Sequence, residues 1–165
     1  MEALKDLRFP ELTVPIKFWV ATKNGSRILS NSELNQAITD LNAELGLSAG
    51  LSFFEDDTED IDDIYLDVCS EATGCSFDTN DGELWTELRS THHKSGVINV
   101  YFLENITSCQ KRGGADTCIV SWLNVGGIGP GGHGTRDDGV VRTKHKLQFD
   151  PAVINHEIGH LFSLD

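Results

Sequence analysis

Two histidines late in the chain have the spacing of a metal-binding pair. His156 and His160 are four residues apart, and on a helix of 3.6 residues per turn they project from nearly the same face, so both imidazoles can bind one ion. Glu157 leaves the helix about 100° away from His156, where it can take a proton from a water molecule on the ion instead of binding the ion itself. The pattern therefore predicts a zinc site with His156 and His160 as ligands and Glu157 as the general base.

A zinc ion that activates water usually has three protein ligands and one open position. The sequence offers several candidates for the third ligand, and no spacing selects one of them. They are His92, His93, His133, His145 and Asp165. From the residues alone, the third ligand stays unassigned.

Two helices are predicted around this motif. Asp150 and Pro151 supply an N-cap and a first-turn proline, which start a helix near residue 151 and carry it through the histidine pair. An earlier helix starts after Ser30, which can form a capping box with Glu33, and ends at Gly46. One apolar stripe runs along this earlier helix. It consists of Leu34, Ala37, Ile38, Leu41 and Leu45.

The strands are predicted from short apolar runs bounded by turn residues. The run at 97–103 is apolar on both faces, so we expect it to be central in a sheet. The other predicted strands are Val14–Ala21, Leu51–Phe54, Ile64–Val68, Ile119–Leu123 and Gly139–Arg142, and the glycine-rich segment 126–134 is expected to be a loop. We expect an α+β fold with a twisted mixed sheet of about five strands in one layer and the two helices in another.

Bulk composition narrows the class of protein. The chain has 165 residues, of which 39% are hydrophobic, which suits one globular domain with a core. Twenty-six acidic and thirteen basic residues give a formal net charge of −13, which repels phosphate backbones, so we expect no nucleic-acid partner. No run of about 18 apolar residues occurs, so no membrane span is expected, and the start lacks the pattern of a signal peptide.

The four cysteines fall into two close pairs, Cys69 with Cys75 and Cys109 with Cys118. Neither pair has Cys-x-x-Cys spacing, so local disulfides in an oxidising, extracellular compartment are the simplest interpretation. Four cysteines allow three pairings. The alternative is four reduced, buried cysteines in a cytosolic protein.

An acidic segment at 55–63 holds seven carboxylates in nine residues, and we expect it to be a loop between two strands. Its functional interpretation is a calcium site, because Ca²⁺ binds several oxygen ligands. The alternating pattern of a calcium-binding loop is absent, and a solvated charged loop is the alternative.

The ten residues from His156 to Asp165 resemble the first ten positions of the metzincin signature His-Glu-x-x-His-x-x-Gly-x-x-His. Its last position, the third zinc ligand, would be the residue after Asp165, and the methionine turn would lie further on. Ser163 stands where the signature has glycine. The order of predicted elements is similar to that of the pappalysin-type peptidases and their bacterial secreted relatives, with matrixins as neighbours.

This resemblance implies that residues 1–165 are the N-terminal part of the catalytic domain of a secreted zinc endopeptidase. Its substrate would be a protein or peptide, added as an antiparallel strand to the edge strand at 119–123. The residues of that strand are Ile119, Val120, Ser121, Trp122 and Leu123. Two alternatives stay open: a gluzincin, whose third ligand is a glutamate on a later helix, and an inactive secreted acidic module that binds calcium or zinc.

Overall fold

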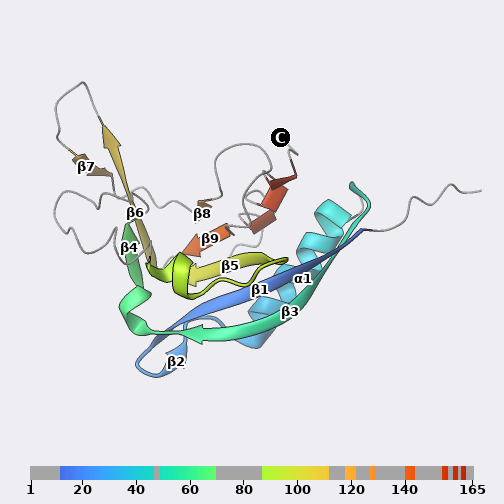
Figure 1. Ribbon diagram of the computed structural model, residues 1–165, viewed down its shortest axis with the longest axis horizontal. Helices are drawn as coiled ribbons and strands as arrows, with labels where there is room; N and C mark the ends of the chain where they lie inside the picture. The colour runs from blue at the N-terminus through green and yellow to red at the C-terminus, as the bar shows by residue number, and fades with distance from the viewer. Residues whose placement is uncertain are drawn as a thin grey trace, which may run out of the picture.

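The main sheet is organised around two parallel strands, β1 (Leu12–Lys23) and β5 (Ile98–Leu103), at its centre (Figure 1). β3 (Leu51–Ile61) pairs in parallel with β1, and β9 (Val140–Thr143) pairs in parallel with β5. The computed structural model describes residues 12–46, 49–69, 87–111, 118–121, 127–128, 140–143, 154–155, 158–159 and 161–162. The predicted central position of the 97–103 strand is confirmed, as are the strands predicted at 14–21 and 139–142.

Two short strands make the sheet mixed. β2 (Ser26–Arg27) folds back antiparallel on the end of β1 through Asn24 and Gly25, whose φ angles are 54° and 76°. Asn-Gly favours this kind of hairpin because both positions tolerate positive φ. β8 (Gly127–Ile128) pairs antiparallel with β9, inside the segment that was predicted to be a loop. The result is a six-stranded mixed sheet in an α+β fold. The predicted α+β class and the predicted mixed sheet are therefore confirmed.

The first helix, α1 (Asn31–Leu41), has the predicted capping box. The Ser30 hydroxyl accepts a hydrogen bond from the Glu33 amide, and the Glu33 carboxylate accepts one from the Ser30 amide at 2.7 Å. The helix continues as a π-helical turn, η1 (Asn42–Gly46). Its buried side chains belong to the predicted stripe, and they are Leu34, Ala37, Leu41 and Leu45.

Two hydrophobic cores cover the two faces of the sheet. Alternate residues of β1 belong to different cores, with Phe18 in the first and Trp19 in the second, because successive side chains of a strand point to opposite faces. The first core consists of Ile16, Phe18, Val20, Leu29, Leu34, Ala37, Leu41, Leu45, Leu51, Phe53, Val100, Phe102, Ile154 and Ile158. The second core consists of Trp19, Ala21, Ile61, Tyr65, Leu88, Tyr101 and Leu103.

The described residues near the end of the chain are helical at 154–155, 158–159 and 161, within or next to the helix predicted at 151–160. Ile154 and Ile158 are fully buried in the first core, and Phe162 packs against it, with its ring 6.0 Å from that of Phe53. This segment therefore lies on the same face of the sheet as α1. None of the helices in the described part of the chain has the length and apolar character needed to cross a membrane.

The loop predicted at 55–63 is wrong over most of its length, because β3 continues through Glu55 to Ile61. A strand is stable here because the segment pairs with β1, the Lys17 ammonium of β1 neutralises Asp57 and Glu59, and Ile61 is itself buried in the second core. The strand predicted at 64–68 is confirmed only at its end, where residues 67 and 68 belong to β4 (Asp67–Cys69), and a 3₁₀ turn, η2 (Asp63–Tyr65), takes its first part.

A second, three-stranded sheet consists of β4, β6 (Asn105–Lys111) and β7 (Cys118–Ser121), in the order β4-β6-β7. Figure 1 shows it beyond the end of β5, and Glu104 joins β5 to β6. β7 contains the first three residues of the strand predicted at 119–123, whereas β6 is a strand that the sequence did not predict.

Candidate functional site

The predicted zinc ligands, His156 and His160, and the predicted general base, Glu157, lie outside the residues that the structure describes. Their described neighbours show how the segment is held. Ile154 and Ile158 are both fully buried in the first core, and residues four apart on a helix share a face. One face of the segment is thus fixed against α1 and the sheet.

Asn155 is the polar exception among these neighbours. It lies one residue before His156 and its side chain is only 4% exposed. Its Nδ2 donates a hydrogen bond to the Glu44 carboxylate in η1. Its Oδ1 is buried and has no hydrogen-bond partner within the described part of the chain.

The segment 154–162, which contains the predicted zinc motif, is called the zinc-motif segment. His92, a candidate third ligand, lies on the opposite face of the sheet from its described residues. Its ring packs edge-on against Trp19 and Tyr65, with ring centroids 5.2 and 5.5 Å apart. Both aromatic residues belong to the second core, whereas Ile154 and Ile158 belong to the first. Burial lowers the pKa of His92, which fits a neutral imidazole packed among aromatic rings. The structure therefore does not bring His92 to the motif.

The other candidates for a third ligand are not brought to the motif by any described contact. His93 is exposed and follows His92 on the far side of the sheet. His133, His145 and Asp165 lie outside the described residues, as does Ser163.

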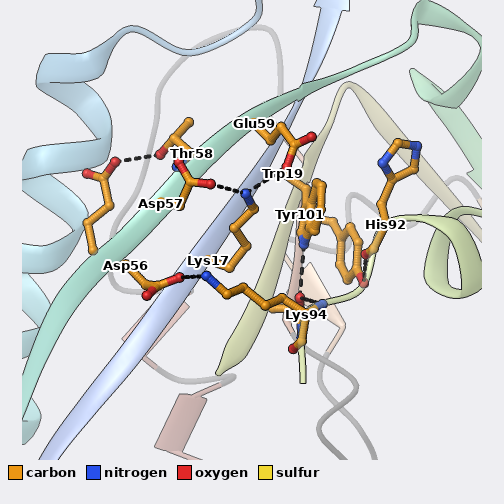
Figure 2. Close-up of polar contacts among 11 residues, drawn as sticks. Lys17, Trp19, Asp56, Asp57, Thr58, Glu59, His92, Lys94 and Tyr101 are labelled. Atoms are coloured by element: carbon orange, nitrogen blue, oxygen red, sulfur yellow. Dashed lines mark hydrogen bonds and ion pairs between the residues drawn. The ribbon is translucent and has the colours of Figure 1, made fainter. Parts of the chain in front are cut away.

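The acidic strand β3 carries an ion-pair network around one buried lysine, and the carboxylates of this network are exposed (Figure 2). The Lys17 ammonium, only 3% exposed, donates to Asp57 at 2.5 Å and to Glu59 at 2.7 Å, and it lies 4.5 Å from the centre of the Trp19 ring. Burial acts to lower the pKa of Lys17, but the hydrogen bonds to Asp57 and Glu59 and the attraction of their negative charges together outweigh burial, so its pKa is raised. The hydrogen bond from Lys17, followed by that from the Thr58 amide, lowers the pKa of Asp57.

Further carboxylates of the predicted calcium segment are also paired. Asp56 forms an ion pair with Lys94 at 2.5 Å, and Asp60 forms one with Arg27. The Glu55 carboxylate accepts a hydrogen bond from the Thr58 hydroxyl at 2.7 Å. A cavity of about 320 Å³ lies between α1 and β3, lined in part by Glu55, Asp57 and Arg27. Among the described residues no group of three or more histidine, cysteine, aspartate or glutamate side chains could hold a metal ion. Calcium binding stays a prediction.

Comparison with protein-family models, with curated protein sequences and with solved structures finds no match.

One buried residue that the sequence did not single out is Asn99, the second residue of β5. Its Oδ1 accepts hydrogen bonds from the Trp19 indole at 3.0 Å and from the Lys94 amide at 2.9 Å, and its Nδ2 donates to the Lys94 carbonyl at 2.9 Å. Asn99 thus fixes the turn before β5 to the centre of the sheet. In the sequence, Asn99 is the one amide side chain within the apolar run 97–103. That isolated polar residue was the available indication of a buried hydrogen-bonding role.

The predicted substrate strand occupies a different place from the one expected. Of its residues, Ile119, Val120 and Ser121 belong to β7, which pairs with β6 in the second sheet, and Trp122 and Leu123 lie outside the described residues. β7 is an edge strand of that small sheet. In the main sheet, the edge position beside β9 is held by β8.

Three of the four cysteines lie in the second sheet. Cys69 ends β4, Cys109 lies in β6 opposite Val120, and Cys118 begins β7 opposite Lys111. Cys109 and Cys118 are therefore on neighbouring strands, two register positions apart. Cys75 lies outside the described residues, and the disulfide pairing stays a prediction.

Proposed function

We propose that this chain carries the zinc-binding helix of a metallo-endopeptidase, with His156 and His160 as ligands and Glu157 as the general base. The observation that carries the proposal is the His-Glu-x-x-His spacing on a segment that is helical at 154–155, 158–159 and 161 and that packs in a core. Two imidazoles suit this role, because neutral histidine is among the usual ligands of zinc.

The buried side of the segment supports the proposal. His156 and His160 are each two positions from Ile158 in sequence, which corresponds to about 160° around a helix. Because Ile158 faces the first core, helical geometry predicts that both histidines point away from the core. A metal site needs that arrangement, since substrate and water must reach the ion.

Each residue of the motif has a distinct role in the proposed reaction. His156 and His160 would hold the zinc ion, which when bound polarises the scissile carbonyl and acidifies water. Glu157 would accept the proton of the attacking water and then deliver it to the leaving amine. β1, α1, β5 and β9 precede the helical segment in the chain, and the metzincin-like plan is proposed from the resemblance of the sequence motif alone.

A substrate strand could pair with an exposed sheet edge. The strand predicted for this purpose, Ile119–Leu123, remains a candidate through β7. β8 is better placed, because it lies beside β9, and β9 is the strand that precedes the zinc-motif segment. Substrate binding at either edge belongs to the proposal.

The test compares wild type with Glu157→Gln in the full-length protein, measuring zinc content and cleavage of casein. We expect the variant to keep its zinc and to lose about 10²- to 10⁴-fold in turnover, the usual contribution of a general base. Glu104→Gln is the matched control. The Glu104 carboxylate pairs with the Lys23 ammonium at a distance of 2.5 Å, and no described contact joins it to the motif. His156→Ala should lose zinc and activity together.

Each outcome separates the alternatives. Full activity in zinc-loaded Glu157→Gln would contradict the mechanism. Stoichiometric zinc in wild type without hydrolysis of casein would support the non-enzymatic binding module instead.

A further inference from the structure

A polar contact between described residues joins the zinc-motif segment to η1, the turn that follows α1. Asn155 donates from Nδ2 to the carboxylate of Glu44, 111 residues earlier in the chain. Asn155 is buried, whereas Glu44 is exposed. The contact thus fixes the residue directly before His156 to a defined point on η1.

The burial of Asn155 needs an explanation, because it does not favour stability. Its Oδ1 has no partner within the described part of the chain, and an unpaired buried acceptor typically costs about 1–3 kcal/mol. Ile154 and Ile158, on the same segment, are apolar and fully buried. Leucine has the same number and branching of side-chain heavy atoms as asparagine and no polar atom to leave unpaired, so burial in an apolar core does not explain the amide at 155.

The turn that carries Glu44 is itself fixed to the sheet. Asn42 donates to the Phe53 carbonyl at 2.8 Å and accepts from the Phe53 amide at 2.7 Å. At Gly46 an added Cβ would lie 2.9 Å from the Leu51 carbonyl oxygen, so the end of the turn packs closely on β3. η1 is also a π-helical turn, a conformation found frequently at functional sites. These contacts to β3 therefore hold the turn, and Glu44 within it, in a fixed position.

We propose that Glu44 and Asn155 form a positioning pair that sets the orientation of the zinc-motif helix at His156. The pair acts through the helix backbone, so neither residue is a zinc ligand or a catalytic group. This inference rests on the proposed function, because it gives Asn155 a role in the same metal site.

The test is a double-mutant cycle on zinc affinity in the full-length protein, measured by competition with a chromophoric chelator at a temperature where circular dichroism shows every variant folded. Asn155→Leu and Glu44→Leu should each weaken zinc binding about tenfold, as changes to groups that orient metal ligands do. The double variant should be no weaker than either single variant. Glu44→Gln keeps an acceptor oxygen and should bind zinc within about threefold of wild type.

Ser30→Ala is the control for a purely structural effect, since it removes the cap of α1 without touching the zinc-motif segment. It should lower stability and leave zinc affinity unchanged. Equal zinc affinities for wild type, Asn155→Leu and Glu44→Leu would overturn the inference, as would additive losses in the double variant. If Asn155→Leu does not fold, Glu44→Leu decides alone, because Glu44 is exposed.

The same data separate this inference from the proposed function. If wild type binds no zinc, or His156→Ala binds it as tightly as wild type, the proposed function fails and the positioning pair fails with it. If His156→Ala abolishes zinc binding while Asn155→Leu binds normally, only the positioning pair is wrong.

Discussion

Replacing Ile158 with alanine should destabilise the whole fold, although Ile158 lies between Glu157 and Gly159 in the zinc motif. Ile158 is fully buried in the first core, together with side chains of α1, β1 and β5. The substitution removes about three methylene-sized groups from that core, each worth about 0.8 kcal/mol of transfer free energy. A cavity penalty adds to this loss, so we expect the free energy of unfolding to fall by about 3 kcal/mol.

The assay is urea unfolding followed by far-ultraviolet circular dichroism and by tryptophan fluorescence. EDTA is present throughout, because a metal that binds only the folded state would add its own stabilisation. Ile64→Ala is the matched control, since Ile64 is 52% exposed. It should change the free energy of unfolding by no more than about 0.5 kcal/mol.

A loss below about 1 kcal/mol for Ile158→Ala would refute the reasoning. Such a result would mean that the helical segment opens as a separate unit of low stability before the rest of the fold. The same conclusion would follow if Ile158→Ala and Ile64→Ala were equally stable.

Three further predictions concern the supports around the sheet. Ser30→Ala should lower the free energy of unfolding by about 1 kcal/mol in urea titrations, because it removes the N-cap of α1. Trp19→Phe should cost about 1–2 kcal/mol by circular dichroism, since it deletes the indole donor to Asn99 and leaves a buried acceptor with one partner fewer. Burial lowers the pKa of His92 below its ordinary value of 6.5. The stability contributed by the buried neutral imidazole is therefore complete above pH 6.5 and is lost as the pH falls through the pKa of the folded state. His92→Gln should therefore flatten the decline in stability on the acid side of pH 6.5, measured as melting temperature against pH.

The elements that sequence reasoning predicted are those whose signals are local. α1 has its cap, its apolar stripe and its terminal glycine within one stretch of chain, and each feature acts over a few residues. β5 is apolar on both faces, which only a central strand tolerates. The α+β class followed from these elements and from the apolar run of β1.

The errors arose where a partner distant in sequence decides the structure. Glu55 to Ile61 appear too acidic for a strand, but the buried ammonium of Lys17, 40 residues away from Asp57, neutralises part of that charge. β6 has a mostly polar sequence, and pairing with β4 and β7 makes it a strand. Strand preference depends more on such neighbours than on the residues themselves.

The candidate site likewise has a part that local spacing predicts and a part that depends on contacts between residues distant in sequence. The spacing of His156 and His160 is visible in the sequence because a helix turn is local. The contact between Asn155 and Glu44 spans 111 residues, and no local pattern indicates it. The exclusion of His92 as a ligand likewise required knowledge of which face of the sheet each core covers.

The parallel pairing of β1 with β5 also affects how the chain folds. Contacts such as that between Trp19 and Asn99 join residues 80 positions apart, and proteins dominated by such non-local pairings fold on timescales of about milliseconds to seconds. During synthesis, β1 emerges long before β5, and the first core is not complete until Ile154 and Ile158 have also emerged. The apolar face of β1 therefore stays incompletely covered until those residues have been synthesised, and the nascent chain has to be protected from aggregation for that period.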